Sequence, residues 1–453
     1  MKKLALLLLL LAANACLAGP RVPGASPDGV PQRLILALDG IPYDVFADLQ
    51  QRGHFGNFRP AARMVSTFPS LSDVSFAAIG GGEPPEGYQN MRFDPVRNRV
   101  VGNTLGSLSS RLHPNLDADS PAHSSAHRMI GYMAAYRVSL KDMREMGREV
   151  LRSPNATYVA YLEETDAVLH VEGRPGAERF LLKLDAFLLD LQEKVRARTG
   201  RELLVDIVSD HGSTMVKGDV VRLEPRLREC GFNRRSRLDR PTDVAYSLAG
   251  IISSVAISVA PAQAEALARC LAPLEGVDLV AIDRGNAVGV LTGDGEAEVR
   301  VQPGDGERYL YTALRGDPLG LLVGADRPER SFSQAELFQA SRAASRPDPL
   351  RRLWMAFHGA VQRPTPVLLS LADGYEAGNA QVRALARIRG RAGTHGSMTR
   401  LASLGVLAST WRDMPDVNAW TAHEAIFGAA TAAAQASASE LRPADKRVIS
   451  LGQ

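Results

Sequence analysis

A short apolar run that stops abruptly at metal-binding side chains limits most strongly what this chain can fold into. The segment 203–212, LLVDIVSDHG, has the length and the β-branched content of a buried parallel strand, and it ends in Asp210, His211 and Gly212. Open parallel sheets bind ligands at the carboxyl ends of their strands. The segment therefore predicts an α/β protein with a ligand site where this strand ends.

Two other segments have the same form. RLILALDG (33–40) ends in Asp39 and Gly40, and TYVAYLEETD (157–166) ends in acidic residues that include Asp166. Residues 177–198 carry apolar side chains at helical spacing between the second and third runs. Strand, helix and strand in this order indicate a βαβ unit. We therefore expect a doubly wound, mostly parallel sheet with helices on both faces.

The three predicted strands place several carboxylates on one rim of the sheet. Such crowding is unfavourable without cations, because like charges raise one another's pKa. Histidines add nitrogen ligands: His170 follows Asp166 by four residues, and His395 lies in the glycine-flanked loop AGTHGSM. Nitrogen donors combined with carboxylates suit zinc better than magnesium or calcium. The rim is thus predicted to be a metal site.

The 453 residues exceed one minimal domain. After Gly212 the chain changes to shorter strand-like runs and one helix, separated by turn signals. We expect an α/β cap inserted at 216–389 into a core formed by 32–215 and 390–453.

The first residues form a separate class of segment. Lys2 and Lys3 precede an apolar run and then small residues, the pattern of a secretory signal over 1–18, and a Gly/Pro-rich linker follows at 19–31. The run is too short for a comfortable membrane span. Cys16 stands where bacterial signals place a lipid-acceptor cysteine, although Ala13 replaces the usual Leu. Export to the periplasm or beyond is expected, with the protein either lipid-anchored at Cys16 or soluble.

A soluble mature chain would keep two cysteines, Cys230 and Cys270. In an oxidising compartment they can form one disulfide or remain two buried thiols. The sequence does not decide between these, because pairing depends on the separation of the Cα atoms.

The charge balance disfavours a nucleic-acid partner. Basic residues number 53 and acidic residues 50, a net charge of +3, and no Lys/Arg run appears. Nucleic-acid binding requires a clustered basic excess. Membrane contact is expected only through a lipid at Cys16. A small phosphate ester or a lipid headgroup as substrate is what the family resemblance described next implies.

The order of these motifs resembles the alkaline phosphatase superfamily, and more closely its nucleotide pyrophosphatase/phosphodiesterase branch. The match runs from about residue 33 to 215 and resumes near 390. It rests on Asp39 after a strand, Thr67-Phe68-Pro69, Asn90 with Asp94-Pro95, Glu164-x-Asp166-x-x-x-His170-x-x-Gly173, Asp210-His211-Gly212, and Gly393-x-His395-Gly396.

The resemblance implies two zinc ions, with manganese as a substitute. One ion would be held by Asp166, His170 and His395, and the other by Asp39, Asp210, His211 and Thr67. Thr67 would be the nucleophile and would form a phospho-threonine intermediate. Asn90 would bind a phosphate oxygen in the transition state.

Some positions depart from the branch. Ser66, Ser70 and Leu71 surround the Thr-Phe-Pro motif where the branch often has Lys, Asn and His, and Ser213 replaces the usual Met after Asp-His-Gly. No Cys-x-Pro-x-Arg context is present, which disfavours a sulfatase. Cleavage of phosphodiester or pyrophosphate bonds is the expected activity. The alternatives are a phosphomonoesterase and a catalytically silent binding protein with the same fold.

Overall fold

The computed structural model describes residues 32–102, 118–119, 125–248, 250–302, 307–324, 327–378 and 392–428. The predicted signal segment 1–18 with Cys16, the linker 19–31, and the ends of the predicted cap and core (379–389 and 429–453) lie outside the described residues. Among the described helices, none combines the length and the apolar character needed to cross a membrane.

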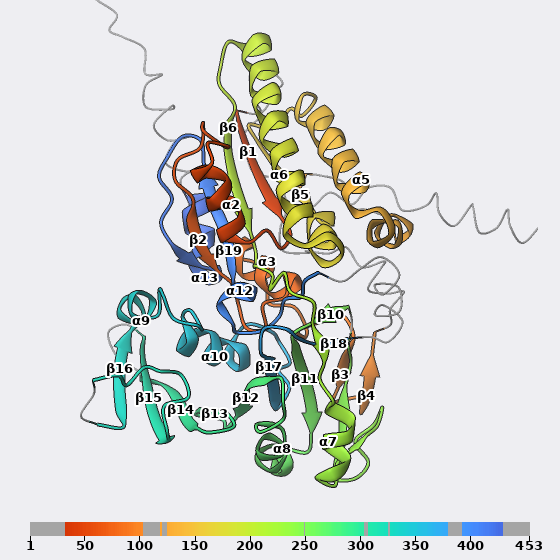
Figure 1. Cartoon of the computed structure of the whole chain (residues 1–453), viewed down its shortest axis with the longest axis vertical. Coiled ribbons are helices and arrows are strands. Elements are labelled where there is room, and N and C mark those ends of the chain that lie inside the picture. The colour runs from red at the N-terminus through yellow and green to blue at the C-terminus, as the bar shows by residue number, and fades with distance from the viewer. Residues whose placement is uncertain are drawn as a thin grey trace, which may run out of the picture.

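The upper half of Figure 1 contains a six-stranded sheet in the order β20-β2-β19-β6-β1-β5. All of its strands run parallel except β19. The three predicted strands are its adjacent members β6, β1 and β5. The strand bounds are β1 Arg33–Leu38, β2 Ala62–Val65, β5 Thr157–Leu162, β6 Leu204–Ser209, β19 Leu404–Ser409 and β20 Val417–Asn418.

Helices cover both faces of this sheet, which confirms the doubly wound fold. Alternate side chains of β1 point to opposite faces. Leu34, Leu36 and Leu38 pack with helices α2, α5 and α6, whereas Ile35 and Ala37 pack with α3 and α13. The helix bounds are α2 Tyr43–Gln51, α3 Ser72–Gly80, α5 Ser125–Val150, α6 Glu164–Thr199 and α13 Ala419–His423, with a short π-helical turn at Glu424–Gly428.

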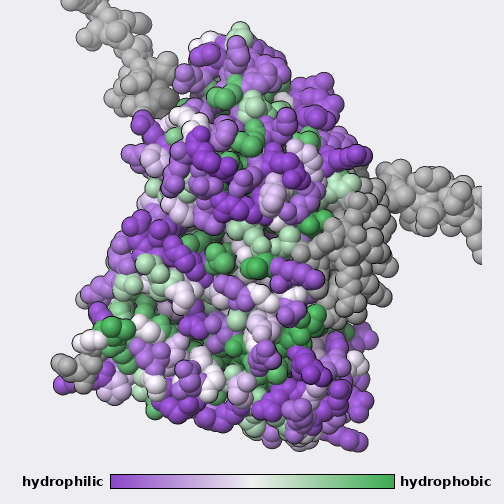
Figure 2. All heavy atoms as spheres, in the orientation of Figure 1, coloured by the Kyte–Doolittle hydropathy of each residue, from purple (hydrophilic) through white to green (hydrophobic). Residues whose placement is uncertain are grey.

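The lower half of Figure 1 contains a nine-stranded sheet, which we call the cap sheet. It is antiparallel except for the pair β8 and β9. Its order is β16 Glu329–Ser333, β15 Arg308–Arg315, β14 Glu296–Gln302, β13 Val288–Leu291, β12 Val277–Asp283, β17 Val367–Leu371, β11 Ser254–Val259, β9 Asp243–Tyr246 and β8 Asn233–Arg234. Polar side chains cover most of the visible face of both halves (Figure 2).

The two faces of the cap sheet have different partners. One face packs against α10 (Pro349–His358) and also against Phe68 and Leu71, which belong to the core loop before α3. The other face packs against α7 (Leu223–Glu229) and α8 (Ala264–Leu271). The cap thus contacts the core directly beside the loop that carries the Thr-Phe-Pro motif. Three short helices complete the described elements: η1 Pro261–Gln263, α9 Gln334–Ala340 and α12 Arg400–Ser403.

Two small sheets lie beside the cap sheet. The hairpin β3 (Arg92–Asp94) and β4 (Arg99–Val101) comes from the segment predicted to be core, yet Val100 N donates to Ser236 O of the cap at 3.1 Å. The three-stranded sheet β10-β18-β7 comprises Ile251–Ile252, Tyr375–Gly378 and Asp219–Val220. Ile252 of β10 also forms a bridge with His395, so this sheet joins the cap to the loop of a predicted metal ligand.

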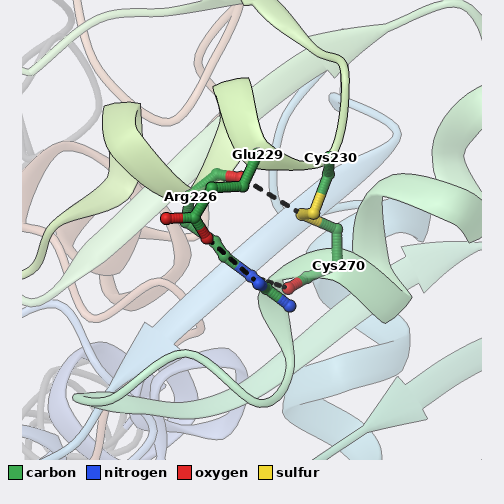
Figure 3. The surroundings of a disulfide bond; sticks show 4 residues. All are labelled: Arg226, Glu229, Cys230 and Cys270. Atoms are coloured by element: carbon green, nitrogen blue, oxygen red, sulfur yellow. Dashed lines mark hydrogen bonds and ion pairs between the residues drawn. A yellow bond between two sulfur atoms is a disulfide. The ribbon is translucent and has the colours of Figure 1, made fainter.

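The structure pairs Cys230 with Cys270, whose Cα atoms are 6.2 Å apart. Figure 3 shows this disulfide between the end of α7 and α8, with Arg226 beside it. Arg226 Nε donates to the Cys270 carbonyl oxygen at 2.9 Å. Of the two alternatives left open by the sequence, the structure has the bonded one.

We expect the double variant Cys230→Ser/Cys270→Ser to lose ~2–4 kcal/mol of unfolding free energy, because the cross-link restricts the unfolded chain. The disulfide lies on the outer face of the cap, so turnover at low temperature should be retained. Urea unfolding, measured with and without reductant, checks this. A midpoint that is unchanged by reductant in the unsubstituted protein would contradict it.

Candidate metal centre

The register of the central strands explains why the ligands meet. Leu38 of β1 lies opposite Leu162 of β5 and Ser209 of β6, so all three strands end at one level. The residues that follow each strand therefore enter the same space, as expected for the carboxyl ends of parallel strands. Two clusters result, and within each cluster the ligand atoms lie within 4.8 Å of one another. The clusters are Asp39, Asp210 and His211, and Asp166, His170 and His395.

The first cluster is buried. His211 Nε2 is 3.4 Å from both Asp39 Oδ1 and Asp210 Oδ2. The other oxygens of the two carboxylates are fixed from outside: Gly40 N donates to Asp210 Oδ1 at 3.0 Å, and the Tyr161 hydroxyl donates to Asp39 Oδ2. One face of each carboxylate therefore remains directed at His211.

The second cluster combines a helix with a distant loop. Asp166 and His170 are one turn apart on α6, and His170 Nε2 lies 3.1 Å from Asp166 Oδ2. His395 comes from the loop before α12, and its Nε2 lies 3.7 Å from Asp166 Oδ1. The predicted ligand nearly 230 residues later in the chain is thus beside the helix pair, as the metal-site prediction required.

The two clusters are neighbours. The rings of His211 and His395 stack with centroids 3.9 Å apart. Gly40 lies between them in a left-handed conformation with φ of 71°, and a Cβ there would come 2.9 Å from Asp166 Oδ1 and 3.2 Å from His211 Cε1. Only glycine fits this position, because any other residue would be strained and would push on both clusters.

All three histidines are oriented in the same way. Nδ1 of His170, His211 and His395 lies 2.9, 2.8 and 2.9 Å from the carbonyl oxygens of Gly393, Gly212 and Ser70, respectively. A carbonyl oxygen only accepts hydrogen bonds, so Nδ1 carries a proton and Nε2 is the nitrogen left to bind a metal ion. Nε2 is the atom that faces the carboxylates in each case. Such outer contacts are how proteins orient histidine for a metal ion.

The charges of the clusters are unbalanced in the way that a cation would relieve. Burial and the nearby Asp39 charge raise the pKa of Asp210 well above its usual range. Burial alone would raise the pKa of Asp166, but the attraction of His170 and His395 outweighs it and holds that pKa well below the usual range. Asp166 Oδ1 and Asp210 Oδ2, one oxygen from each cluster, are buried without a hydrogen-bond donor. Nitrogen and carboxylate donors with one unsatisfied oxygen per cluster fit two zinc-type cations.

Thr67 is not the hydroxyl that faces the clusters. It is completely buried, and its Oγ1 donates to Pro69 O at 2.8 Å and lies 2.9 Å from Ser75 Oγ. Ser72 has the position that the resemblance gave to Thr67: its Oγ donates to Asp39 Oδ1 at 3.0 Å and lies 3.1 Å from His211 Nε2. Ser72 is also the first residue of α3, where the helix dipole favours negative charge.

The loop before Ser72 is attached to the loop of His395. Besides the contact of Ser70 O with His395, Ser70 N donates to Gly396 O at 3.1 Å and Gly396 N donates to Ser70 Oγ at 3.2 Å. Ser70 Oγ in turn donates to Ser397 O at 2.9 Å. The departure from the branch at Ser70 therefore has a structural role, because it holds a metal-ligand loop.

Asn90 belongs to the segment between α3 and β3. It is partly buried and precedes β3, and its carbonyl oxygen lies so close to Gly102 that a Cβ there would approach to 2.4 Å. Asp94 supports a turn, since its Oδ1 accepts from Val96 N at 2.9 Å and Arg97 N at 3.2 Å. The contact of Asn90 with substrate phosphate stays a prediction.

Sequence reasoning missed three residues around the clusters: Ser72, Tyr161 and Arg352. Tyr161 lies near the end of β5 and is only partly buried, between two buried residues. Because β5 pairs with β1, whose last residue directly precedes Asp39, the Tyr161 side chain could have been expected near Asp39. Ser72 was visible as the third residue after Pro69 and immediately before an apolar helical run. Arg352 had no sequence signal, because an arginine in a helix is normally exposed.

Comparison with known proteins tests the predicted fold. No protein-family model matches the chain, and no curated protein sequence matches it. Among solved structures, phosphonoacetate hydrolase from Sinorhizobium meliloti 1021 in complex with phosphonoformate aligns with a TM-score of 0.50 and 14% identity, over 89% of this chain and 96% of that one. Murine ectonucleotide pyrophosphatase/phosphodiesterase 5 aligns with a TM-score of 0.46 and 14% identity, over 87% of this chain and 93% of that one.

The chain is thus an α/β protein whose central sheet carries two adjoining clusters of metal-ligand type. The likeness to phosphonoacetate hydrolase, which extends over nearly the whole of both chains, confirms the fold expected from the resemblance to the alkaline phosphatase superfamily.

Proposed function

We propose that this protein is an exported, two-metal hydrolase of phosphodiester or pyrophosphate bonds. The observation that carries the proposal is the place of the Ser72 hydroxyl, within hydrogen-bond reach of Asp39 and His211 in one cluster, which itself adjoins the second cluster. A nucleophile held by the ligands of paired cations is an arrangement suited to phosphoryl displacement.

Zinc is the proposed metal, with manganese as the substitute. Asp39, Asp210 and His211 would hold one ion, and Asp166, His170 and His395 the other. Once bound, such a pair supplies positive charge for the phosphoryl oxygens and lowers the pKa of a coordinated hydroxyl. The remaining contributions come from the chain itself.

Ser72 Oγ forms a bond to phosphorus while the bond from phosphorus to the leaving alcohol or phosphate oxygen breaks. Asp39 Oδ1 accepts the Ser72 hydroxyl hydrogen in the resting structure and is the adjacent base for its proton. The dipole at the start of α3 favours the negative charge that develops there. Water then cleaves the phosphoserine ester, releasing phosphate or a phosphomonoester and restoring the hydroxyl. We also propose that Asn90 binds a non-bridging phosphate oxygen of the substrate in the transition state.

Export is proposed from the first residues of the sequence, and two findings are compatible with it. The disulfide between Cys230 and Cys270 belongs to proteins of oxidising compartments. The short apolar run at 4–13 has the charged start and small-residue end of a secretory signal. Lipid attachment at Cys16 is the rival to a soluble form.

Turnover of chromogenic esters tests the activity. We expect zinc-loaded protein to hydrolyse bis-p-nitrophenyl phosphate with a kcat/KM more than tenfold above that for p-nitrophenyl phosphate, and prolonged treatment with a chelator to abolish both activities. The chelated protein should also melt at a lower temperature, since bound metal stabilises only the folded state. A preference for the monoester would indicate a phosphomonoesterase. No turnover by protein shown to contain two metal ions would indicate a silent binding protein.

A further inference from the structure

A cavity of about 620 Å³ opens in the cap beside the hairpin β3–β4. We call it the cap pocket. Its lining includes apolar side chains, an aromatic ring, hydroxyls, two guanidinium groups and one carboxylate, among them Met91, Leu248, Tyr246, Arg234, Arg235 and Glu224. A pocket with an apolar wall and few charged groups is typical of a site for an organic molecule.

The cap pocket lies in a strongly basic part of the sequence. Residues 222–240 contain seven arginines and three carboxylates, a net charge of +4 in a chain whose net charge is +3. This excess concentrates positive potential at one end of the cap. Anions that carry an organic group are therefore the ligands that its charge favours.

The two arginines of the pocket have different surroundings. Arg234 Nη1 lies 2.6 Å from Glu224 Oε1, and its guanidinium stacks 4.4 Å from the centroid of Tyr246, so its charge is largely compensated and its position is fixed. Arg235 is exposed, and no ion pair joins its guanidinium to any carboxylate in the described part of the chain. The backbone of Arg235 is nevertheless anchored, because its N–H donates to Val244 O at 2.9 Å. Arg235 is the cation that remains for a ligand.

The pocket is within reach of the metal centre. Gly378, which lines the pocket, pairs with Ile251 of β10, and the next residue, Ile252, forms a bridge with His395. Two steps between neighbouring strands place the Gly378 edge of the pocket about 10 Å from the backbone of His395. A single small molecule can span this distance.

We propose that the cap pocket is a substrate subsite in which Arg235 binds a second anionic group, a carboxylate or a phosphate, at the end of the substrate remote from the phosphorus atom that reacts at the metal centre. This inference rests on the proposed hydrolase function and names its substrate class: phosphate esters or anhydrides with a distal anion, as opposed to neutral esters. Tyr246, Met91 and Leu248 would contact the organic part between the two charges.

Three p-nitrophenyl phosphodiesters test the proposal. Their second alcohol is 1-hexanol, 6-hydroxyhexanoic acid or 6-phosphohexanol, so they differ only in the terminal group, and the extended arm reaches roughly 10 Å. We expect kcat/KM, measured by p-nitrophenolate release, to be at least tenfold higher for an anionic arm than for the hexyl ester. The carboxylate and phosphate arms show which anion is preferred.

Arg235→Gln is expected to remove this preference while leaving kcat/KM for the hexyl ester unchanged. The matched control is Arg240→Gln, which removes an exposed arginine of the same basic segment that does not line the pocket. Equal kcat/KM for all three esters in the unsubstituted protein, or equal loss of preference in both variants, would overturn the subsite.

A binding measurement separates this proposal from the hydrolase function. Calorimetric titration of the metal-loaded protein with hexyl phosphate and with 6-phosphohexanoate requires no turnover. We expect the second ligand to bind at least tenfold more tightly, and Arg235→Gln to equalise the two. If no ester is hydrolysed but this difference in binding persists, the subsite stands without the proposed activity. If the two ligands bind equally, the subsite is wrong whatever the turnover.

Discussion

Replacing Ser72 by alanine is expected to lower kcat for a phosphodiester by roughly 10⁴-fold or more, the scale found when a nucleophile is removed. The reason is geometric, since Ser72 Oγ is 3.0 Å from Asp39 Oδ1 and 3.1 Å from His211 Nε2. No described ligand atom of either cluster is lost, so metal content should stay at two ions per chain and the melting temperature should change little. Stopped assays together with metal analysis of the same preparation check both halves of the expectation.

Thr67→Val is the matched variant, because it removes the hydroxyl assigned as nucleophile by the resemblance and keeps the branched shape. Removing the Thr67 hydroxyl would break the contacts of Thr67 Oγ1 with Pro69 O and Ser75 Oγ. We expect this to cost ~1 kcal/mol of unfolding free energy. Turnover should remain within a few-fold of the unsubstituted protein. An inactive Thr67→Val together with an active Ser72→Ala would restore Thr67 as the nucleophile and reject Ser72.

The covalent intermediate gives an independent measurement. Acid quenching during turnover of a phosphodiester should leave the phosphoryl group, with its remaining alcohol, on the peptide that contains both residues. Fragmentation by mass spectrometry distinguishes attachment at Ser72 from attachment at Thr67. Phosphate on Thr67 would contradict the assignment even if both variants were impaired.

The sequence could predict the fold of the core because its central strands have a pattern of residues that is easy to recognise. β1, β5 and β6 are apolar on both faces and end in polar residues, a pattern that only a covered parallel sheet explains. Given three such strands side by side, the meeting of Asp39, Asp166 and Asp210 follows from their common end. The position of His395 could be predicted only from the order of the motifs. Nothing local in AGTHGSM determines where a loop so far along the chain will lie.

The nucleophile that we propose differs from the one assigned by the resemblance, and the difference has a physical reason. Thr-Phe-Pro resembles a known motif, but the hydroxyl nearest the clusters is decided by where α3 begins, and the first residue of α3 is Ser72. Strand ends can be located from apolar runs, whereas the path of a loop of six residues cannot. The contact of the β3–β4 hairpin with the cap is a similar case, because its bonds are to residues more than a hundred positions away.

The feature that the sequence indicated least is a completely buried arginine at the junction of cap and core. Arg352 lies on α10 and is inaccessible to solvent. Burial lowers the pKa of Arg352 to about 9, so the guanidinium remains charged at neutral pH. Its hydrogen bonds reach Thr67 O at 3.0 and 3.3 Å, Pro347 O at 3.1 Å, Met398 O at 3.2 Å, Ser397 O at 3.5 Å and Ser403 Oγ at 2.8 Å.

These acceptors belong to the two loops that carry the chemistry. Thr67 begins the loop that ends at Ser72, and Ser397 and Met398 directly follow the loop of His395. One cap side chain therefore sets the spacing between the proposed nucleophile and a proposed ligand of the second metal. Because a guanidinium has five donors in a fixed plane and an ammonium is a compact point charge, lysine cannot replace this set of contacts.

Arg352→Lys and Arg352→Gln are accordingly expected to lose roughly 3–5 kcal/mol of unfolding free energy, the cost of breaking a buried charged network. A merely structural role would affect stability alone. If Arg352 also positions the His395 loop, folded variant protein at low temperature should bind zinc 10- to 100-fold more weakly, as found when the outer contacts of metal ligands are removed. Arg330→Gln, an exposed cap arginine over the Phe332 ring, should change neither quantity. Calorimetric zinc titration gives the zinc affinity, and urea unfolding gives the unfolding free energy. Unchanged zinc affinity in a destabilised variant would show that Arg352 only holds the cap on the core.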